Sequence, residues 1–481
     1  MSFRYPWKSL WTALGVAVVA AAIVFVGFVA GAAAPSNSST LAILYTNQAY
    51  GQIRSCNCTK FRYGGYGREA TFVKKARTEN ANLVIIEGGD AVGRDDTEQE
   101  RLKANLAVNA IGAIGYSAFV PGESELGYDR KSLEGWTSSS KTPFILANAK
   151  FKDTGKPVCS RPYTIQKMPN GLRVAIVGIA GPELFPEVME AGLQVEVTDP
   201  EPALKGLLPK IRPQADFVIV MAHCETEKAR ALAKLPGVDV VICTHAFEKL
   251  KMPAKDENIV EATTEKIGKC IFVVSNSRTG WSVGRLDLEF DGKTVKTVRN
   301  RQCYLDRAYD EDPELVKLYN EYNAKVAEVT TTQQNELRAK FEALLKERGI
   351  DPSKRQRPKP YSGATACKTC HEEAYDTWTK TRHATAFASL QKTGQESDPE
   401  CFTCHTTGAM QRGGFTSAKD TPELTNVQCE ACHGGGASHA AKPVAGFGAI
   451  SEDLCRGCHT ESYNPDFDYE QMLKPISHKK Q

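Results

Sequence analysis

The sequence predicts two dissimilar folded parts: an α/β layered domain, followed by a mainly α segment with little regular secondary structure. Between about residues 40 and 304, short apolar runs alternate with helical patterns, as they do in α/β layer structures. Residues 361–481 hold 8 of the 15 cysteines and 7 of the 9 histidines. This segment has few apolar runs, so something besides polypeptide must fill its core.

The overall composition is that of a folded protein. Of the 481 residues, 41% are hydrophobic and 24% are charged, which excludes wholesale disorder. The 60 basic and 57 acidic residues give a net charge of +3. Because this surplus is so small, charge gives no argument for nucleic-acid binding. We therefore expect no nucleic-acid partner.

The N-terminus has the pattern of an export segment. Arg4 and Lys8 precede an uncharged apolar run over about residues 13–34, and such a run approaches the roughly 20 residues that span a bilayer. Three alanines at its end resemble a cleavage site, but the proline that follows disfavours cleavage. We interpret residues 1–38 as a signal peptide or, in preference, an uncleaved membrane anchor. Either alternative places the remainder in the periplasm, where disulfides and covalent cofactors form.

The α/β domain is expected over residues 39–308. Its buried strands are predicted at residues 41–45, 83–87, 144–147, 173–179, 217–222 and 238–243. Helical patterns over residues 101–114 and 226–235 lie between some of these strands. Closing strands are predicted at residues 271–275 and 284–290, with Asp291-Gly292 as a hairpin turn.

A helix and a linker are predicted over residues 309–360. Apolar side chains recur at alternating spacings of four and three, the stripe of an amphipathic helix, at Leu315, Tyr319, Tyr322, Val326 and Val329. The apolar stripe continues as far as Gly349. Residues 351–362 are rich in Pro, Lys and Arg, a composition typical of linkers.

Four consecutive C-x-x-C-H motifs, 34, 28 and 26 residues apart, occupy the last part of the chain. This pattern attaches haem c, because the two thiols bond the vinyl groups and the histidine binds the iron. Zinc ribbons also pair C-x-x-C motifs, but zinc does not require a histidine after every pair. Residues 361–481 are therefore predicted to hold four covalent haem c groups, close enough together to conduct electrons. The attachment residues are Cys367, Cys370 and His371 (motif 1), Cys401, Cys404 and His405 (motif 2), Cys429, Cys432 and His433 (motif 3), and Cys455, Cys458 and His459 (motif 4).

Three histidines of this segment lie outside the motifs: His383, His439 and His478. In so haem-dense a segment we interpret them as second axial ligands rather than surface residues. Three spare imidazoles for four irons leave one iron either five-coordinate or bound by a methionine, with Met410 or Met472 as candidates. An open iron could bind a small molecule.

The C-terminal segment resembles the tetrahaem cytochrome c family of the nitrifier electron carrier that accepts electrons from hydroxylamine oxidation. The resemblance rests on the four motifs, on His383 within W-T-K-T-R-H-A, and on His439 shortly after C-H-G-G-G. It covers about the last 121 residues. It implies three haems with two histidine ligands each and one open haem.

Short polar segments follow several of the expected strands: Thr46-Asn47-Gln48-Ala49-Tyr50-Gly51, Gly88-Gly89-Asp90, Gly122-Glu123-Ser124-Glu125, Ala222-His223 and Thr244-His245-Ala246-Phe247. In this order they resemble T-N-D-x-H-G, G-G-D, G-N-H-E, a ligand histidine, and G-H-x-H or G-H-x-Q. These are the motifs of the metallophosphatase domain of the bacterial 5′-nucleotidase family, a group that includes a thiosulfate-pathway hydrolase. The resemblance implies an α/β fold with metal ligands at its strand ends.

The departures from these motifs fall mainly on one of the family's two metal positions. There Gln48, Tyr50 and Phe247 replace the ligands, and Ser124 replaces the catalytic histidine. By the same resemblance, the other position keeps its aspartate and two histidines as Asp90, His223 and His245, and Glu123 replaces its asparagine ligand with another oxygen donor. Because two-metal hydrolysis needs both ions, we interpret the domain as a non-hydrolytic scaffold or docking module. Its site holds either one divalent ion, such as zinc, iron or manganese, or none.

Seven cysteines lie outside the haem motifs, an odd number that leaves at least one unpaired within the chain. Buried thiols or structural disulfides are the expected roles. Metal ligation by the two sulfurs nearest the histidines of the α/β domain stays open as an alternative. The seven are Cys56, Cys58, Cys159, Cys224, Cys243, Cys270 and Cys303.

Three functions follow from these patterns. The preferred one is an exported electron-transfer cytochrome with redox protein partners, either other cytochromes or a membrane quinone-linked complex, and with the N-terminal segment as membrane contact. The second is a haem-based oxidoreductase acting on a small nitrogen or sulfur compound at an open haem. The third is an exported phosphoesterase or nucleotidase, which the replaced ligands disfavour.

Overall fold

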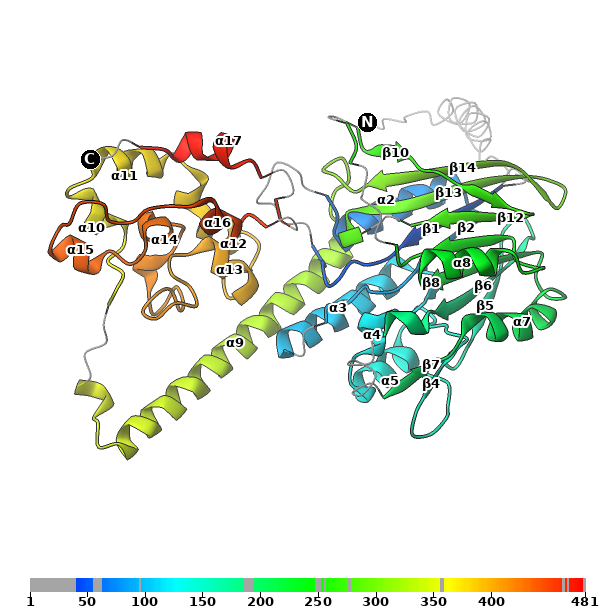
Figure 1. The fold of residues 1–481 in the computed structure, drawn as a ribbon, viewed down its shortest axis with the longest axis horizontal. Helices are drawn as coiled ribbons and strands as arrows, with labels where there is room; N and C mark the ends of the chain where they lie inside the picture. Colours follow the sequence, from blue (N-terminus) through cyan, green and yellow to red (C-terminus); the bar gives the residue numbers. More distant parts are fainter. Residues whose placement is uncertain are drawn as a thin grey trace, which may run out of the picture.

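Two six-stranded sheets form the centre of the α/β domain (Figure 1). The computed structural model describes residues 40–478, apart from residues 55–62, 95–96, 186–193, 247–251, 255–256, 276–277, 355–358, 461–462 and 465–466. The predicted anchor or signal peptide, Cys56, Cys58 and Phe247 lie outside the described residues. No helix within the described ranges is both long and apolar enough to cross a membrane.

The strand order is β10-β14-β13-β1-β2-β3 in the first sheet and β11-β12-β9-β8-β6-β5 in the second. The first sheet comprises β1 (Thr40–Thr46), β2 (Leu83–Glu87), β3 (Ala118–Phe119), β10 (Ile259–Glu261), β13 (Ser282–Asp291) and β14 (Thr294–Tyr304). The second comprises β5 (Tyr163–Lys167), β6 (Arg173–Ala180), β8 (Phe217–His223), β9 (Val240–Cys243), β11 (Glu265–Ile267) and β12 (Cys270–Val274). β4 (Ala149–Phe151) and β7 (Val195–Val197) form a separate pair.

The two sheets pack face to face. Because successive side chains of a strand point to opposite faces, each strand contributes one set of residues to this shared core and the other set to its outer face. In β8, Ile219 and Met221 join the core shared with the first sheet. The alternate residues Val218 and Val220 instead join a second core with the outer helices. Neighbouring strands β1 and β2 are parallel, as are β6, β8 and β9. Their carboxyl ends therefore lie at the same edge of each sheet.

Helices cover the outer faces. The first sheet is covered by α2 (Tyr66–Glu79), α3 (Glu98–Ile114) and the start of α9, and the second by α7 (Pro200–Ile211) and α8 (Thr226–Ala233). Two further helices, α4 (Glu123–Leu126) and α5 (Arg130–Ser139), follow β3. The predicted α/β layered class is confirmed. The longer predicted strands agree with the structure to within two residues, except at residues 144–147, which form only isolated bridges at Phe144 and Ile145.

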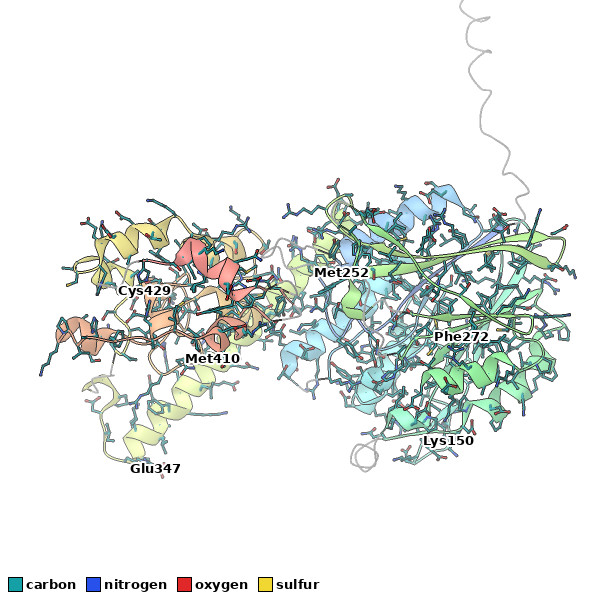
Figure 2. All side chains as sticks on the ribbon, turned by 45° about the horizontal axis from the view of Figure 1, so that its top comes forward. Lys150, Met252, Phe272, Glu347, Met410 and Cys429 are labelled. Carbon is teal, nitrogen blue, oxygen red and sulfur yellow. The ribbon has the colours of Figure 1, made fainter. Side chains whose placement is uncertain are left out.

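One long helix, α9 (Pro313–Glu347), connects the two parts of the chain (Figure 1). It begins at Asp312, whose side chain accepts the backbone N–H of Glu314, with Pro313 in the first turn. Its first half is anchored in the α/β domain, where the hydroxyl of Tyr319 donates to the carbonyl of Ile53 at 2.8 Å. Its far end, at Glu347, extends beneath the C-terminal domain (Figure 2).

The C-terminal domain consists of short helices and turns. They are α10 (Ala364–Lys368), α11 (Glu372–Thr379), α12 (Ala386–Gln391), α13 (Pro399–His405), α14 (Cys429–His433), α15 (Ala437–Ala441), α16 (Glu452–Arg456) and α17 (Tyr469–Leu473). Its apolar core cluster contains six buried side chains: Phe387, Leu390, Phe402, Ala409, Phe415 and Leu424. So small a core cannot by itself order a domain of this length.

Polar contacts join the C-terminal domain to α3 at the residues beside motif 2. The ammonium of Lys103 lies 2.6 Å from the carboxylate of Glu400 and 2.5 Å from that of Glu100. Burial would lower the pKa of Lys103, but the two carboxylates raise it. Gln99 donates to Asp398 at 2.6 Å. The segment that precedes Cys401 is therefore held against the α/β domain.

The close packing of β13 on β1 makes Gly284 sensitive to substitution. A Cβ atom at this position would lie 2.0 Å from Cε2 of Tyr45, whose ring is fully buried and whose hydroxyl donates to Asn300 at 2.8 Å. We expect Gly284→Ala to destabilise the α/β domain by about 3 kcal/mol, measured as a lower denaturation midpoint. Gly206→Ala is the control, because a Cβ there meets nothing within 4 Å and α7 should gain stability. A wild-type midpoint in Gly284→Ala would contradict the prediction.

Candidate functional site

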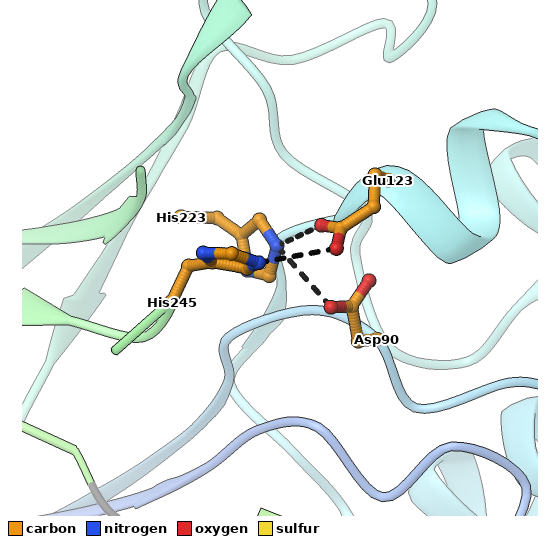
Figure 3. A group of neighbouring side chains, drawn as sticks. All are labelled: Asp90, Glu123, His223 and His245. Atoms are coloured by element: carbon orange, nitrogen blue, oxygen red, sulfur yellow. Dashed lines mark hydrogen bonds and ion pairs between the residues drawn. The ribbon is translucent and has the colours of Figure 1, made fainter. Parts of the chain in front are cut away.

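Four buried side chains converge at the carboxyl ends of the parallel strands (Figure 3). Asp90 follows β2 and Glu123 begins α4 after β3, while His223 ends β8 and His245 follows β9. Each residue offers one ligand atom, and these atoms all lie within 4.8 Å of one another. Loops at this edge of an α/β sheet commonly form binding sites. The structure thus brings together the four metal ligands proposed from the sequence.

The distances within the cluster suit a shared cation. His223 Nε2 lies 2.6 Å from Glu123 Oε2 and 3.5 Å from Asp90 Oδ2. His245 Nε2 lies 3.2 Å from Glu123 Oε1. Asp90 Oδ2 is buried and makes no hydrogen bond, although a buried carboxylate oxygen ordinarily has a partner. Two imidazole nitrogens and two carboxylates form a donor set that zinc, iron or manganese accepts.

Neighbouring groups orient the ligands. His223 Nδ1 donates to the carbonyl of Gly88 at 2.6 Å, which fixes the tautomer and directs the Nε2 lone pair into the cluster. Asp90 Oδ1 accepts the N–H of Ser124 at 2.9 Å, and Glu125 accepts the N–H of Asp90 at 2.9 Å. The side chains are therefore held in place from outside the cluster.

The pKa shifts have the same physical origin. Burial would lower the pKa of His223, but the carboxylates of Asp90 and Glu123 raise it well above its ordinary value. Burial would raise the pKa of Glu123, but hydrogen bonds from His223 and His245 hold it well below its ordinary value. The cluster therefore stabilises positive charge between its two carboxylates. A divalent metal ion would supply that charge.

The residues at the altered family positions contact one another instead of contributing ligands to the cluster. Gln48 Nε2 donates to the hydroxyl of Tyr50 at 2.9 Å. Gln48, Tyr50 and Asp90 all have left-handed backbone conformations, with φ of 52°, 46° and 60°. Such conformations cost energy in residues other than glycine and concentrate at functional sites. Arg94, which the sequence patterns did not single out, contacts Glu123 and Ser124.

The cysteines that the structure describes outside the haem motifs are not part of this cluster. Cys159, Cys224, Cys243, Cys270 and Cys303 are all buried. Cys224 and Cys243 pack in the core between the second sheet and its outer helices, and the thiol of Cys243 donates to the carbonyl of Cys224 at 3.4 Å. The sulfur-ligation alternative therefore has no support from the geometry.

In the C-terminal domain, each histidine outside the motifs lies opposite one motif histidine. The ring centres are 6.3 Å apart for His371 and His439, 6.2 Å for His459 and His383, and 5.8 Å for His433 and His478. Two imidazoles on opposite sides of one metal ion, with bonds of about 2 Å, have ring centres about 6 Å apart. The three pairs thus have the spacing of axial ligands. Each of the three spare histidines faces a motif histidine other than His405.

Neither methionine proposed for the fourth iron is arranged as a ligand of His405's iron. Met410 has 79% of its surface exposed. Met472 Sδ accepts from Asn464 Nδ2 at 3.4 Å, and the same amide contacts His459 of motif 4 at 3.0 Å. Met472 therefore lies beside motif 4, whose histidine already faces His383.

The attachment thiols of different motifs come together in pairs. Cys367 of motif 1 lies close to Cys429 of motif 3, and Cys404 of motif 2 lies close to Cys458 of motif 4. Cys432 of motif 3 also interacts with Cys455 of motif 4. The motifs are therefore connected in the order 1, 3, 4, 2. Motif 2, at one end of this series, is the one held against α3.

Several apolar side chains of the C-terminal domain are exposed, as expected for a surface that bound haem would cover. Phe447 stacks on His439 at 4.5 Å between ring centres, although 37% of its surface is exposed. Val444, Ile450 and Leu454 are also exposed. Apolar surface of this extent around paired histidines is what a porphyrin face would bury.

Comparison with known proteins bears on both domains. An uncharacterized metallophosphoesterase, YunD, from Bacillus subtilis is 22% identical over 286 residues, covering 57% of this chain and 60% of that protein. A snake venom 5′-nucleotidase from Naja atra is 26% identical over 299 residues, covering 57% and 55%. A 5′-nucleotidase precursor from Thermus thermophilus superposes with a TM-score of 0.50 at 18% identity, covering 60% and 59%. The α/β domain has the metallophosphoesterase fold. The 5′-nucleotidase resemblance predicted from its motifs is confirmed.

Residues 366–434 match the family model for cytochrome c554 and c-prime. This match includes motifs 1, 2 and 3, and it confirms the predicted resemblance of the C-terminal segment to that type of cytochrome. The part of this chain that matches the metallophosphoesterases spans 60% or less of the length of each such relative named above. Their activities therefore do not transfer to it as a whole.

Proposed function

We propose that this protein is an exported multihaem c-type cytochrome that transfers electrons between redox partners. The observation that carries this proposal is the set of three histidine pairs at 5.8–6.3 Å, each including a C-x-x-C-H histidine. Haem bound by two histidines undergoes reversible one-electron reduction with no site left for substrate. The four attachment motifs neighbour one another in the series 1, 3, 4, 2, which would hold the haems close together. The likeness to cytochrome c554 supports the same function.

A redox titration of the purified protein, followed by absorbance, tests this proposal. We expect four covalently bound haems per chain, each reduced reversibly, with low potentials for the three that have two histidine ligands. Fewer than four covalent haems, or haems that are not reduced reversibly, would contradict it. Oxidation of the reduced protein by candidate periplasmic cytochromes, or its reduction by a quinone-linked membrane complex, would then identify the partners. Fractionation of the producing cells tests the proposed periplasmic or membrane-anchored location.

A haem-based oxidoreductase is the second candidate, and His405 favours it. The three spare imidazoles face other motif histidines, and Met410 is exposed. An iron bound by His405 would then keep one position open for a small nitrogen or sulfur compound. Carbon monoxide tests this second candidate, since six-coordinate iron does not bind it readily. If none of the four haems binds carbon monoxide, catalysis at a haem is excluded.

We propose that the metallophosphoesterase-like domain is a scaffold that holds the cytochrome and retains one divalent metal ion. Asp90, Glu123, His223 and His245 would hold that ion, which would act as a Lewis acid when bound. Gln48, Tyr50 and Ser124 stand where the family resemblance expects two further metal ligands and a catalytic histidine. Phosphate release from nucleotides by metal-supplemented protein would overturn the scaffold proposal and support a phosphoesterase.

His223→Ala should remove the metal ion. His223 Nε2 faces both carboxylates, so its loss should weaken metal binding by more than the roughly 10–100-fold that loss of an outer partner costs. Elemental analysis of the purified variant, compared with the wild type, measures the effect. Cys224→Ala is the matched control, because it alters the adjacent residue outside the cluster. Equal metal content in wild type and His223→Ala would exclude this site.

A further inference from the structure

Arg94 supplies a positive charge directly beside the four-residue cluster. Its guanidinium pairs with Glu123 Oε1, and its Nε donates to the hydroxyl of Ser124 at 3.2 Å. It also lies 5.8 Å from the centre of the Tyr50 ring, within the range of a cation–π contact. Two separate segments, helix α4 with Glu123 and Ser124 and the loop after β1 with Tyr50, therefore hold this side chain in position.

Glu123 faces two different cationic groups with its two oxygens. Oε2 lies 2.6 Å from His223 Nε2, on the side of the proposed metal ligands. Oε1 contacts the guanidinium of Arg94 and also lies 3.2 Å from His245 Nε2. A metal ion held by the cluster and the guanidinium would thus be bridged by one carboxylate, in the manner of two neighbouring cations.

Charge and exposure favour an anion at this place. Asp90 and Glu123 together carry two negative charges, which one divalent ion would neutralise. Arg94 then leaves these side chains with a net positive charge, and its guanidinium cannot lose its proton in a protein. The side chain of Arg94 is 49% exposed, whereas that of Glu123 is 3% exposed. An anion arriving from solvent would therefore meet the guanidinium at the entrance to the cluster.

We propose that Arg94 and one divalent metal ion form a two-cation site for a small oxyanion of the phosphate type, with Glu123 bridging the two cations. This proposal rests on the metal ion proposed above. The planar guanidinium matches the oxygen atoms of such an anion. Gln48 and Tyr50 replace ligands of the second metal position. The neighbouring cation is therefore the guanidinium of Arg94 and not a second metal ion. The site therefore binds an oxyanion without the second ion that two-metal hydrolysis requires.

The experiment uses the full-length haem-loaded protein, with Mn²⁺ as metal and inorganic phosphate as ligand. Elemental analysis counts bound Mn²⁺, and calorimetry measures phosphate affinity with and without it. We expect one Mn²⁺ per chain at this site, and phosphate binding that requires it. Arg94→Gln should retain the Mn²⁺ and bind phosphate about tenfold more weakly or worse. Arg94→Lys keeps the positive charge but loses the planar pair of N–H donors, so its phosphate affinity should lie between those of the wild type and Arg94→Gln.

Arg130→Gln is the matched control, since Arg130, at the start of α5, is also a partly exposed arginine paired with carboxylates, here Glu134 and Asp153. It should change neither Mn²⁺ nor phosphate binding. If the Arg94→Gln variant still holds one Mn²⁺ and binds phosphate as tightly as the wild type, Arg94 is not part of the anion site. The metal site would be unaffected by that result. Two Mn²⁺ per wild-type chain at this site would overturn the guanidinium as second cation. Absence of bound Mn²⁺ in the wild type would overturn the metal site, and this proposal with it.

Discussion

Protein made without attached haem should have an unfolded C-terminal domain and an intact α/β domain. The five large buried side chains of the C-terminal core contribute about 1.5–3 kcal/mol each, and Ala409 contributes less. Ordering each residue of backbone costs about 1–2 kcal/mol, and this segment has roughly twenty times as many residues as its core. The α/β domain, in contrast, has two extensive apolar cores of its own. Only the α/β domain can therefore fold without a prosthetic group.

The measurement is limited proteolysis of a variant with all eight motif cysteines replaced by alanine. We expect cleavage throughout residues 361–481 and a resistant fragment that ends within α9 or the following linker. Wild-type protein with four haems should resist cleavage in both domains. A variant lacking only Cys455 and Cys458 should lose one haem and become partly sensitive near α16. A protease-resistant C-terminal domain without haem would contradict the prediction.

The parts of the fold that local sequence determines were predictable. Buried parallel strands are continuous apolar runs, and β2, β6 and β8 were found from theirs. Residues 144–147 have such a run as well, but Phe144 and Ile145 bridge Phe119 and Arg161 singly. Apolarity there reflects burial and not a ladder of hydrogen bonds. Strands of two or three residues, such as β3 and β10, are too short to show any periodicity.

The same distinction applies to the sites. A C-x-x-C-H motif is complete within five residues, so the attachment positions follow from sequence alone. The pairing of His439 with motif 1 and of His383 with motif 4 joins residues far apart in the chain, in opposite directions. No local pattern encodes such pairs. Arg94 belongs to no motif, and only the fold brings it to Glu123.

Reduced wild-type protein should bind carbon monoxide at one haem per chain, and His383→Ala should bind it at two. His383 lies 6.2 Å from His459 between ring centres, so its removal would open the second axial position of the motif 4 iron. We expect the wild-type site to be the iron of motif 2, because the spare imidazoles face the other three motif histidines. Optical titration of the reduced protein counts the bound carbon monoxide.

A methionine variant distinguishes an open iron from one closed by sulfur. Met410 is 79% exposed, so Met410→Ala should leave the carbon monoxide count at one. If Met410 were instead a ligand, the wild type would bind none and the variant one. His439→Ala should raise the count as His383→Ala does, but at the motif 1 iron. A count that stays at one in both histidine variants would exclude these pairings, because an iron deprived of its distal imidazole must become accessible.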